Sequence, residues 1–294
     1  MNKLSYIQLG ATLFVPATHK NLSVIVSKEK YPELKSVVID TEDGIKTSEL
    51  DEALQRIKKI LKVYKKTELL VFIRVRDESV LERLLRVPFI DKIEGFLLPK
   101  VSLLNVDKYL KLLQDRDFYI MPSIEGEELF NHSKLNQLRD KLLTNKEKIV
   151  LVRFGLEDML RQLCMKRQKG RTAFDTSVTS SVIGNFIATF KSAGFGVSGG
   201  VYPYFNDELG FIEDVKRDLQ EGLFTKTIIH PSQITIINEL YKVTQQEYTE
   251  ALEISQEEDG VFAQNGKMAE VKTMSPYAKE ILLRAEVYGI LPLP

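Results

Sequence analysis

The stretch FYIMPSIE, residues 118–125, is a run of mostly apolar residues that ends on an acid, Glu125. The stretch IVLVRFGLED, residues 149–158, has a similar arrangement, because its apolar run leads through a glycine to Asp158. Short apolar runs bounded by turn residues are typical of strands in a parallel sheet buried on both faces. Each acid therefore lies where a buried strand is expected to end. In a parallel α/β barrel those strand ends meet on one face, which carries the catalytic groups.

Eight such runs alternate with segments of helical periodicity along the first 235 residues. One of these segments, Glu49–Lys66, repeats apolar residues at helical spacing and is otherwise mostly charged, which is typical of a helix with one solvent-facing side. This order of elements predicts a (β/α)8 TIM barrel over residues 1–235. The expected strands are Thr12–Val15, Ser36–Asp40, Leu69–Val75, Gly95–Leu98, Tyr119–Ile124, Ile149–Val152, Gly196–Val201 and Thr227–Ile229.

Residues 236–294 contain no further strand of this kind and are expected to form a C-terminal helical extension. The pattern predicts one long amphipathic helix over Ser232–Ser255, an acidic turn at Gln256–Asp259, an irregular segment over Val261–Lys272 and a second helix over Ser275–Tyr288. We interpret this extension as a lid or as an arm used in oligomerisation, with packing beneath the barrel as the alternative.

The charge balance does not favour a polyanionic partner. Lys plus Arg equals 41 and Asp plus Glu equals 41 in the 294 residues, so we expect neither nucleic acid nor an anionic membrane as a partner. No run approaches the roughly 18 apolar residues of a membrane span, and the start of the chain lacks the apolar core of a secretory signal. The single Cys164 excludes an internal disulfide and a cysteine-based zinc site. We expect a cytoplasmic protein.

The two acids at strand ends, Glu125 and Asp158, are the candidate metal ligands. Two carboxylates from neighbouring strand ends can chelate a hard divalent cation such as Mg²⁺, while water and substrate fill the other positions. Acids at the start of a helix also stabilise its dipole, so helix capping is the alternative interpretation for both.

Arg74 lies inside the expected third strand, where a guanidinium needs a partner. It is interpreted as a fork that binds a substrate carboxylate or a developing enolate oxygen. The alternative is an internal ion pair with Glu42 or Asp43, which follow the second strand. Both interpretations are compatible, since the same acids would orient Arg74.

Other polar groups near strand ends admit two interpretations each. Lys166, Arg167 and Arg171 follow the sixth strand and would attract a phosphate-bearing substrate, or are a solvated surface. Lys100 suits a Schiff-base lysine only if its pKa is lowered, and a structural or electrostatic role is preferred. His230 is interpreted as a turn-shaping histidine, with a general base as the alternative.

The segments LFVP (13–16), VIDTED (38–43), IRV (73–75), LPKV (98–101), IEG (124–126), FGLED (154–158), GVYP (200–203) and IHPSQ (229–233) occur in this order. Together they resemble the citrate lyase beta-subunit-like branch of the HpcH/HpaI aldolase superfamily. The segment from Gly170 to Phe195 resembles a subgroup of barrel carbon–carbon lyase-like proteins associated with tellurium-resistance and stress operons.

The resemblance implies a TIM barrel that uses Mg²⁺, with Mn²⁺ as an alternative, held by Glu125 and Asp158. It implies that Arg74 binds a substrate oxygen, with Glu42 and Asp43 nearby as catalytic candidates. Relatives cleave or form a carbon–carbon bond beside a carboxylate or thioester.

The resemblance also implies a homo-oligomer, with a trimer favoured, in which a C-terminal segment covers a neighbour's site. In some relatives an acid after a Gly-x-Met motif joins that site. Here GKMAE, residues 266–270, puts Glu270 in that position, in place of the usual aspartate. Glu270 is therefore a further catalytic candidate.

Two other departures concern substrate binding. The family's Gly-Asp-Arg reads Ala17-Thr18-His19 here, and Asp-Gly-Val-Tyr reads GGVY at residues 199–202. His19, which replaces the arginine, and Lys100 are the remaining candidate substrate-binding residues.

These observations predict a Mg²⁺-dependent carbon–carbon lyase or aldolase that acts on a 2-hydroxy or 2-oxo acid, or on an acyl thioester, through a metal-stabilised enolate. One alternative is a non-catalytic barrel that binds a ligand or partner in a stress-response system. Another is an enzyme for a phosphorylated substrate bound by Lys166, Arg167 and Arg171.

Overall fold

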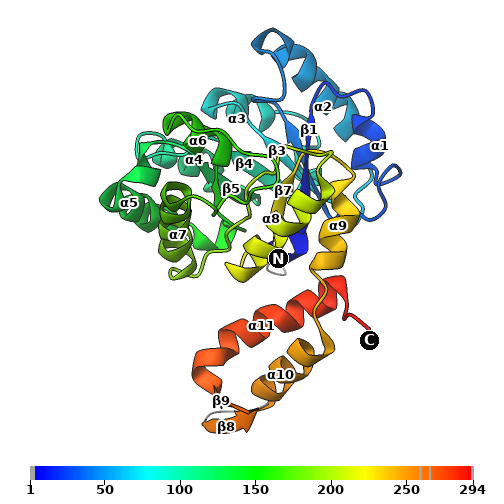
Figure 1. Cartoon of the computed structure of the whole chain (residues 1–294). Coiled ribbons are helices and arrows are strands. Elements are labelled where there is room, and N and C mark those ends of the chain that lie inside the picture. The colour runs from blue at the N-terminus through cyan, green and yellow to red at the C-terminus, as the bar shows by residue number, and fades with distance from the viewer. Residues whose placement is uncertain (1–3, 258–259, 265, 293–294) are drawn as a thin grey trace. The chain divides into compact units, whose positions relative to one another are not determined.

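A computed structural model of the chain describes residues 4–257, 260–264 and 266–292. Contacts divide the chain into two compact units, Met1–Ile234 and Thr235–Pro294. The sequence predicts this boundary after residue 235. Figure 1 labels helices and strands of both units.

The larger unit is built around a parallel sheet with the strand order β6-β5-β4-β3-β2-β1-β7. Helices lie around the outside of this sheet (Figure 1). The strands are β1 (Ala11–Pro16), β2 (Ser36–Asp40), β3 (Leu70–Arg74), β4 (Gly95–Leu98), β5 (Tyr119–Ile124), β6 (Arg153–Phe154) and β7 (Lys226–Ile228).

A segment without regular strand structure, residues 196–199, closes the ring between β6 and β7. Val197 bridges to Val152 and Gly199 bridges to Lys226, both in the parallel sense. A Cβ at Gly199 would lie 2.1 Å from Asp218 Oδ2, so only glycine permits this close approach. Eight parallel segments therefore form the ring, which confirms the predicted (β/α)8 barrel, although the expected seventh strand is reduced to isolated bridges.

The α-helices of the larger unit follow the expected alternation with strands. In α2 the buried residues Ala53, Leu54, Ile57, Ile60 and Leu61 form one face, as predicted for this segment. The helices are α1 (Leu22–Val26), α2 (Leu50–Val63), α3 (Glu78–Leu84), α4 (Val106–Leu113), α5 (His132–Leu143), α6 (Leu156–Gln162), α7 (Ser177–Lys191) and α8 (Glu208–Gln220). Short 3-10 turns are η1 (Tyr6–Leu9), η2 (Thr47–Glu49), η3 (Ile90–Lys92), η4 (Glu127–Phe130) and η5 (Lys146–Lys148).

A layer of apolar side chains packs together as one buried cluster of the barrel. It includes Val38 of β2, Phe72 of β3, Leu97 of β4 and Met121 of β5, together with Leu151 before β6. Because side chains alternate along a strand, the residue two positions later points to the same side. That next position holds Asp40, Arg74, Ser123 and Arg153 in β2, β3, β5 and β6. Polar groups therefore follow the apolar layer toward the carboxyl ends of the strands.

The smaller unit differs from its prediction in three places. The single helix expected over Ser232–Ser255 is wrong, because α9 (Gln233–Leu240) and α10 (Gln245–Gln256) are separate helices. Thr244 starts α10 with a capping box, in which its hydroxyl accepts from the Glu247 amide at 3.1 Å and Glu247 accepts from the Thr244 amide at 2.8 Å. The separation of α9 from α10 follows from this capping box.

The other two differences lie further along the chain. The segment expected to be irregular, Val261–Lys272, contains an antiparallel hairpin of β8 (Val261–Gln264) and β9 (Lys267–Glu270). The helix expected over Ser275–Tyr288 begins earlier, as α11 (Val271–Tyr288). The expected acidic turn at Gln256–Asp259 lies partly outside the described residues.

A separate apolar cluster holds the smaller unit together. It consists of Val243, Ala251, Ile254, Ala278 and Ile281, so α10 and α11 pack on each other. The role of this unit as a lid or oligomerisation arm stays a prediction.

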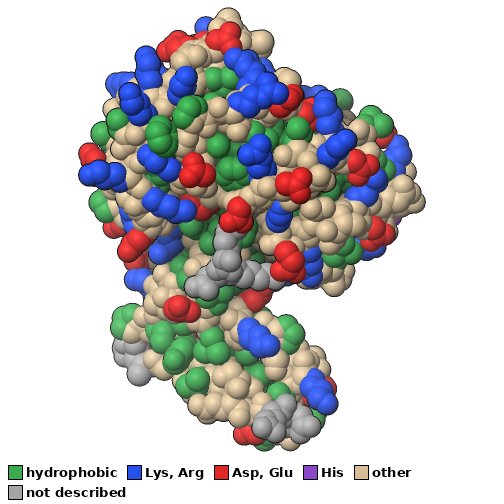
Figure 2. All heavy atoms as spheres, turned by 180° about the vertical axis from the view of Figure 1, so that it is seen from behind, with side chains coloured by type: hydrophobic (Ala, Val, Ile, Leu, Met, Phe, Trp, Pro, Cys, Tyr) green, Lys and Arg blue, Asp and Glu red, His purple; other side chains and the backbone are tan. Residues whose placement is uncertain are grey.

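The outer surface carries both signs of charge. Figure 2 shows Lys and Arg side chains interspersed with Asp and Glu over the visible face of the larger unit. In the part of the chain that the structure describes, no helix combines the length and apolarity needed to cross a bilayer.

Candidate active site

A cavity of about 490 Å³ opens at the carboxyl ends of the barrel strands. This is the end at which barrel enzymes carry their active sites. Its lining contains four predicted site residues. They are Arg74, Glu125 and Asp158, which come from different strand ends, and Asp43. The other lining residues are Phe14, Pro16, Asp40, Gly44, Leu97, Ser123, Arg153, Phe154, Gly155, Glu157, Val201, Thr227 and Ile229.

Arg74 is held by Asp40, a residue that the sequence analysis did not single out. The two residues are partners in the register of β2 and β3. Arg74 Nε donates to Asp40 Oδ1 at 2.7 Å and Nη2 donates to Oδ2 at 2.6 Å, which is a bidentate fork. Asp40 also accepts from the amides of Glu42 at 2.9 Å and Gly44 at 2.8 Å. The carboxylate is therefore fixed from both sides and fixes the arginine in turn.

The third nitrogen of Arg74, Nη1, faces the two predicted acids. It lies 2.9 Å from Glu42 Oε2 and 3.8 Å from Asp43 Oδ2. Burial lowers the pKa of Arg74, but Asp40, Glu42 and Asp43 outweigh it and raise that pKa overall. Arg74 thus stays charged, and the predicted grouping of Arg74 with Glu42 and Asp43 is present in the structure.

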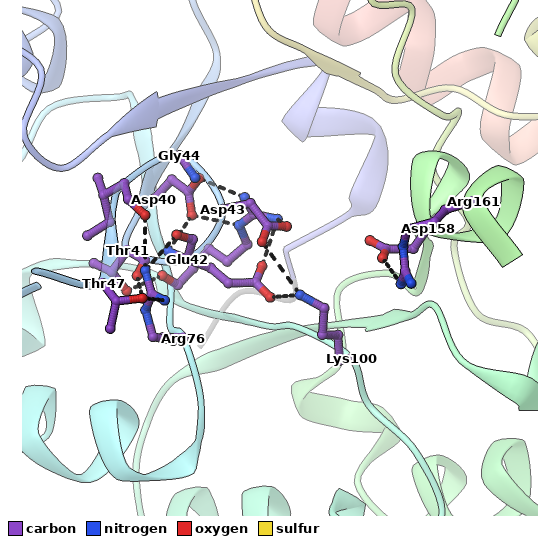
Figure 3. Close-up of polar contacts among 12 residues, drawn as sticks. Asp40, Thr41, Glu42, Asp43, Gly44, Thr47, Arg76, Lys100, Asp158 and Arg161 are labelled. Atoms are coloured by element: carbon purple, nitrogen blue, oxygen red, sulfur yellow. Dashed lines mark hydrogen bonds and ion pairs between the residues drawn. The ribbon is translucent and has the colours of Figure 1, made fainter. Parts of the chain in front are cut away.

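Arg76 holds the loop that carries Glu42 and Asp43 through hydrogen bonds to the loop backbone (Figure 3). Arg76 donates to the carbonyl oxygens of Thr41 at 3.2 Å, Glu42 at 2.9 Å and Ile45 at 3.1 Å. An arginine that satisfies several loop carbonyls removes conformational freedom from that loop. Glu42 and Asp43 are therefore presented on a pre-organised loop.

Lys100 extends from the end of β4 toward this loop and pairs with Glu42 (Figure 3). Partial burial lowers the pKa of Lys100, but the hydrogen bond to Glu42 and the charges of Glu42, Asp43 and Glu125 raise it overall. A Schiff-base lysine needs the opposite shift, toward a neutral amine. The structure therefore favours the electrostatic role for Lys100, which is not among the cavity-lining residues.

Burial also shifts the pKa of Glu42. The loss of water contact raises the pKa of the Glu42 carboxyl, against the opposing charges of Arg74 and Lys100. A buried carboxyl between two cations is a group whose proton affinity depends on both neighbours. Glu42 is thus suited to exchanging a proton if either contact changes.

Glu125 follows β5 directly and is 6% exposed. Its Oε2 atom is buried without a hydrogen-bond partner in the described structure. Burial raises the pKa of Glu125 to about 7, against a hydrogen bond with Ser123, and the charges of Glu42 and Asp158 add to the rise. A buried acceptor without a donor is unfavourable, and a cation would satisfy it.

Gly155 creates the space for this carboxylate. A Cβ at Gly155 would lie 2.3 Å from Glu125 Cγ, closer than any side chain tolerates. The glycine also precedes α6, which carries Asp158 in its first turn. The link between β6 and α6 therefore leaves room for Glu125 and places Asp158 in the lining of the same cavity.

Asp158 accepts from Arg161 Nη2 at 2.6 Å (Figure 3). Arg161 is mostly exposed, so this ion pair is weak and readily exchanged. Gln162 joins the two acids through their backbones, since its Nε2 donates to the carbonyls of Glu125 at 2.5 Å and Asp158 at 3.2 Å. Neither α6 nor η4 has a side-chain capping hydrogen bond. Asp158 does lie in the first turn of α6, where its charge also stabilises the helix dipole.

The donor set fits Mg²⁺. Within the described residues, no group of three or more His, Cys, Asp or Glu side chains is arranged to hold a metal ion. Two carboxylates from Glu125 and Asp158, one with an unpaired buried oxygen, are what Mg²⁺ commonly takes from a protein while it keeps water and substrate oxygens. The assignment of these two ligands stays a prediction.

Arg153 is a cavity residue that the sequence analysis quoted but did not interpret. It is 3% exposed, and its guanidinium donates to the hydroxyls of Thr227 at 2.7 Å, Ser198 at 3.0 Å and Thr12 at 3.1 Å. An arginine embedded in an apolar strand run was the available signal, and it was applied only to Arg74.

Like Glu42 and Lys100, the candidates His19, His230 and Glu270 are not among the residues that line the cavity. His19 lies in the turn after β1, where its Nδ1 accepts from the Asn21 amide at 3.1 Å. His230 accepts from the Ser232 amide at 3.2 Å, which agrees with the turn-shaping interpretation. Glu270 ends β9 in the smaller unit. The roles of His19 and Glu270 stay predictions.

The basic residues after β6 do not form one solvated cluster. Arg167 is buried and pairs with Asp214, which also accepts from Lys226 at 2.9 Å. Lys226 in turn donates to Asp218 at 2.5 Å. Arg167 therefore belongs to a compensated buried network, and together with Lys166 and Arg171 it also lines a separate cavity of about 290 Å³.

A family model described as a carbon–carbon bond lyase of the TIM-barrel fold matches residues 3–290. The chain belongs to this family. The predicted resemblance and the enzyme class, a carbon–carbon lyase, are thereby confirmed.

Curated relatives of this carbon–carbon bond lyase include citrate lyase beta subunits. That of Escherichia coli K12 is 26% identical over 299 residues, 95% of this chain and 93% of the relative. That of Leuconostoc mesenteroides is 24% identical, over 85% and 83% of the two chains. The solved structure of CitE from Mycobacterium tuberculosis with magnesium, acetoacetate and coenzyme A has a TM-score of 0.69 at 19% identity, over 96% and 99% of the chains. RipC from Yersinia pestis has a TM-score of 0.63 at 17% identity, over 83% and 99%.

Proposed function

We propose that this lyase cleaves or forms a carbon–carbon bond beside the carboxylate of a 2-oxo or 2-hydroxy acid, and that it needs Mg²⁺. The observation that carries the proposal is the buried, unpaired Oε2 of Glu125, close to Asp158 in a cavity at the carboxyl end of the barrel. The M. tuberculosis CitE structures with magnesium and oxaloacetate, and with magnesium and pyruvate, support the substrate class.

Mg²⁺ held by Glu125 and Asp158 would supply a Lewis acid for the substrate carbonyl. Arg74 would offer its remaining N–H groups to the oxygen that gains negative charge as the bond breaks. Asp40 keeps that guanidinium in place through the two-bond fork. Because the fork already fixes the guanidinium, this stabilisation would be pre-organised.

Glu42 is the residue we assign to proton movement. Its Oε1 bonds Lys100 and its Oε2 faces Arg74, so a proton on Glu42 would be exchanged with Lys100 or with a group near Arg74. Burial raises the pKa of Glu42, and a carboxyl with a raised pKa holds a proton more readily. Asp43, on the same loop and 60% exposed, would keep the local field negative and Lys100 charged.

The test compares Glu125→Gln and Asp158→Asn with a matched control, Glu127→Gln. Glu127 lies two residues after Glu125 but is exposed and pairs with Lys134. Calorimetry should show Mg²⁺ binding by wild type and by the control, with loss in both site variants. Proton exchange at the methyl group of pyruvate, followed by NMR, should follow the same order. Mg²⁺ binding that survives both site substitutions would remove the ligand assignment.

The finer predictions remain open to separate tests. Use of a coenzyme A thioester is supported by the M. tuberculosis CitE complex with coenzyme A. Replacement of Mg²⁺ by Mn²⁺, trimeric assembly with Glu270 in a neighbour's site, cytoplasmic location and a tellurium-resistance or stress role stay predictions from the sequence.

A further inference from the structure

The cavity contains two arginines with very different electrostatic surroundings. Arg74 has Asp40, Glu42 and Asp43 within ion-pair distance. Arg153 forms no ion pair with any acid among the residues that the structure describes, and every oxygen it contacts is a neutral hydroxyl. Its Nε is buried without a hydrogen-bond partner. The positive charge of Arg153 is therefore uncompensated.

A buried guanidinium without an anion is an expensive feature in a protein core. Burial, together with the nearby Arg74 charge, lowers the pKa of Arg153 to about 9, which leaves it charged at neutral pH. The Phe14 ring, with centroid distances of 5.6 Å to Arg153 and 5.3 Å to Arg74, stabilises both cations only modestly. A group that remains charged, buried and open to a cavity points to an anionic ligand.

The depth of Arg153 in the barrel indicates which part of a ligand it would meet. Arg153 is the register partner of Ser123, two residues before Glu125 on the neighbouring chain segment. At about 3.3 Å per residue, it lies roughly 6 to 7 Å deeper along the strand direction than the proposed cation ligand. This offset suits the length of a short dicarboxylic acid.

We infer that Arg153 is a specificity-determining residue that binds a second carboxylate of the substrate, so that the preferred substrate is a 2-hydroxy or 2-oxo dicarboxylate. This inference rests on the proposed function for the end of the substrate near Glu125 and Asp158. The hydroxyls of Thr12, Ser198 and Thr227 orient the guanidinium without neutralising it. Its Nε, which has no partner, and the Nη2 N–H that contacts only Met121 Sδ at 3.8 Å are the donors for the incoming carboxylate.

The alternative is that Arg153 only holds the barrel together. Its hydroxyl partners come from β1, from residue 198 and from β7, so it does connect three parts of the ring. A purely structural role would lower stability and affect all ligands alike. A role in recognition affects ligands according to their second carboxylate.

The experiment therefore uses two ligands that differ in one group. Malate and lactate share the 2-hydroxy acid group, but the methyl carbon of lactate carries a second carboxylate in malate. Binding of both is measured by calorimetry at saturating Mg²⁺, for wild type, Arg153→Gln and the control Arg86→Gln, which removes an exposed charge. Wild type and the control should prefer malate. In Arg153→Gln, malate affinity should fall about 10- to 100-fold, the value of charge-assisted hydrogen bonds, with lactate nearly unchanged.

Several results would overturn the inference. Wild type could bind malate and lactate with equal affinity, or not bind malate at all. Arg153→Gln could also lower the affinity for both ligands by the same factor. If Arg153→Gln does not fold, Arg153→Lys keeps the charge but loses the planar fork, and it should reduce the preference for malate in part. Malate binding that needs Arg153 but not Mg²⁺ would overturn the metal-dependent function and leave the role of Arg153 standing.

Discussion

The raised pKa of Glu125 makes the stability of the metal-free protein depend on pH. The carboxyl has an ordinary value of 4.5 and rises to about 7 in the folded protein, chiefly because it is buried. The folded state therefore binds a proton that the unfolded state releases between these two values. Stability is highest below about pH 4.5 with respect to this group, and it falls as the pH rises toward 7.

The size of the effect follows from the shift. Since a tenfold change in proton affinity corresponds to about 1.4 kcal/mol, charging Glu125 in the folded protein lowers the free energy of unfolding by about 3 kcal/mol at pH 8. Glu125→Gln cannot ionise and avoids this loss. We expect the variant and wild type to be similar at pH 5, and the variant to be more stable by up to about 3 kcal/mol at pH 8 without metal.

The assay is urea unfolding at pH 5, 6.5 and 8 in the presence of a chelator, with Glu127→Gln as the control. Adding Mg²⁺ at pH 8 should stabilise wild type but not Glu125→Gln, because the cation competes with the proton for the same oxygens. A stability difference between Glu125→Gln and wild type that is the same at all three pH values would refute the reasoning.

Three other changes test the arrangement around the cavity. Asp40→Asn breaks the fork to Arg74 and should lower the free energy of unfolding by about 3 kcal/mol, measured by urea unfolding, because a buried charge loses its main partner; a loss below about 1 kcal/mol would contradict this. Borohydride treatment with pyruvate should give no adduct on Lys100 by mass spectrometry, since its pKa is raised, and a reduced adduct would restore the Schiff-base mechanism. Gly155→Ala should weaken Mg²⁺ binding at least about 10-fold in calorimetry, because its Cβ displaces Glu125, whereas Gly184→Ala, where no atom lies within 4 Å of the added Cβ, should not.

Much of the barrel follows from the sequence because each buried strand is a continuous apolar run that ends on a turn. The same rule brought Glu125 and Asp158 to one cavity, since strand ends of a parallel barrel converge. Asp40 was missed because it lies within the expected strand, where its inward direction depends on the alternation that starts at Val38. Arg153 was missed because it directly follows the expected strand Ile149–Val152, so the alternation from Leu151 that turns it inward was not applied to it.

Elsewhere, local signals outweighed periodicity. The capping box of Thr244 and Glu247 divides a segment whose apolar spacing indicates one helix. In the hairpin of β8 and β9, Phe262 packs against the apolar cluster and its partner Ala269 is buried, while Val261 and Met268 are exposed. With one inward apolar residue in each short strand, the alternation is too brief to mark the hairpin in the sequence. Such a hairpin is defined by its pairing, which spacing alone does not report.

The ring of the barrel is joined least firmly at residues 196–199, where isolated bridges replace a regular strand. Arg153 donates to Ser198 and Thr227 on the inside of this join, while Lys226 pairs with Asp214 and Asp218. The amide hydrogens of this join should therefore exchange with solvent sooner than those of β2 and β3, because fewer hydrogen bonds must open. We therefore expect the barrel to open locally at this join, which lies beside Val201 and Thr227 in the wall of the cavity.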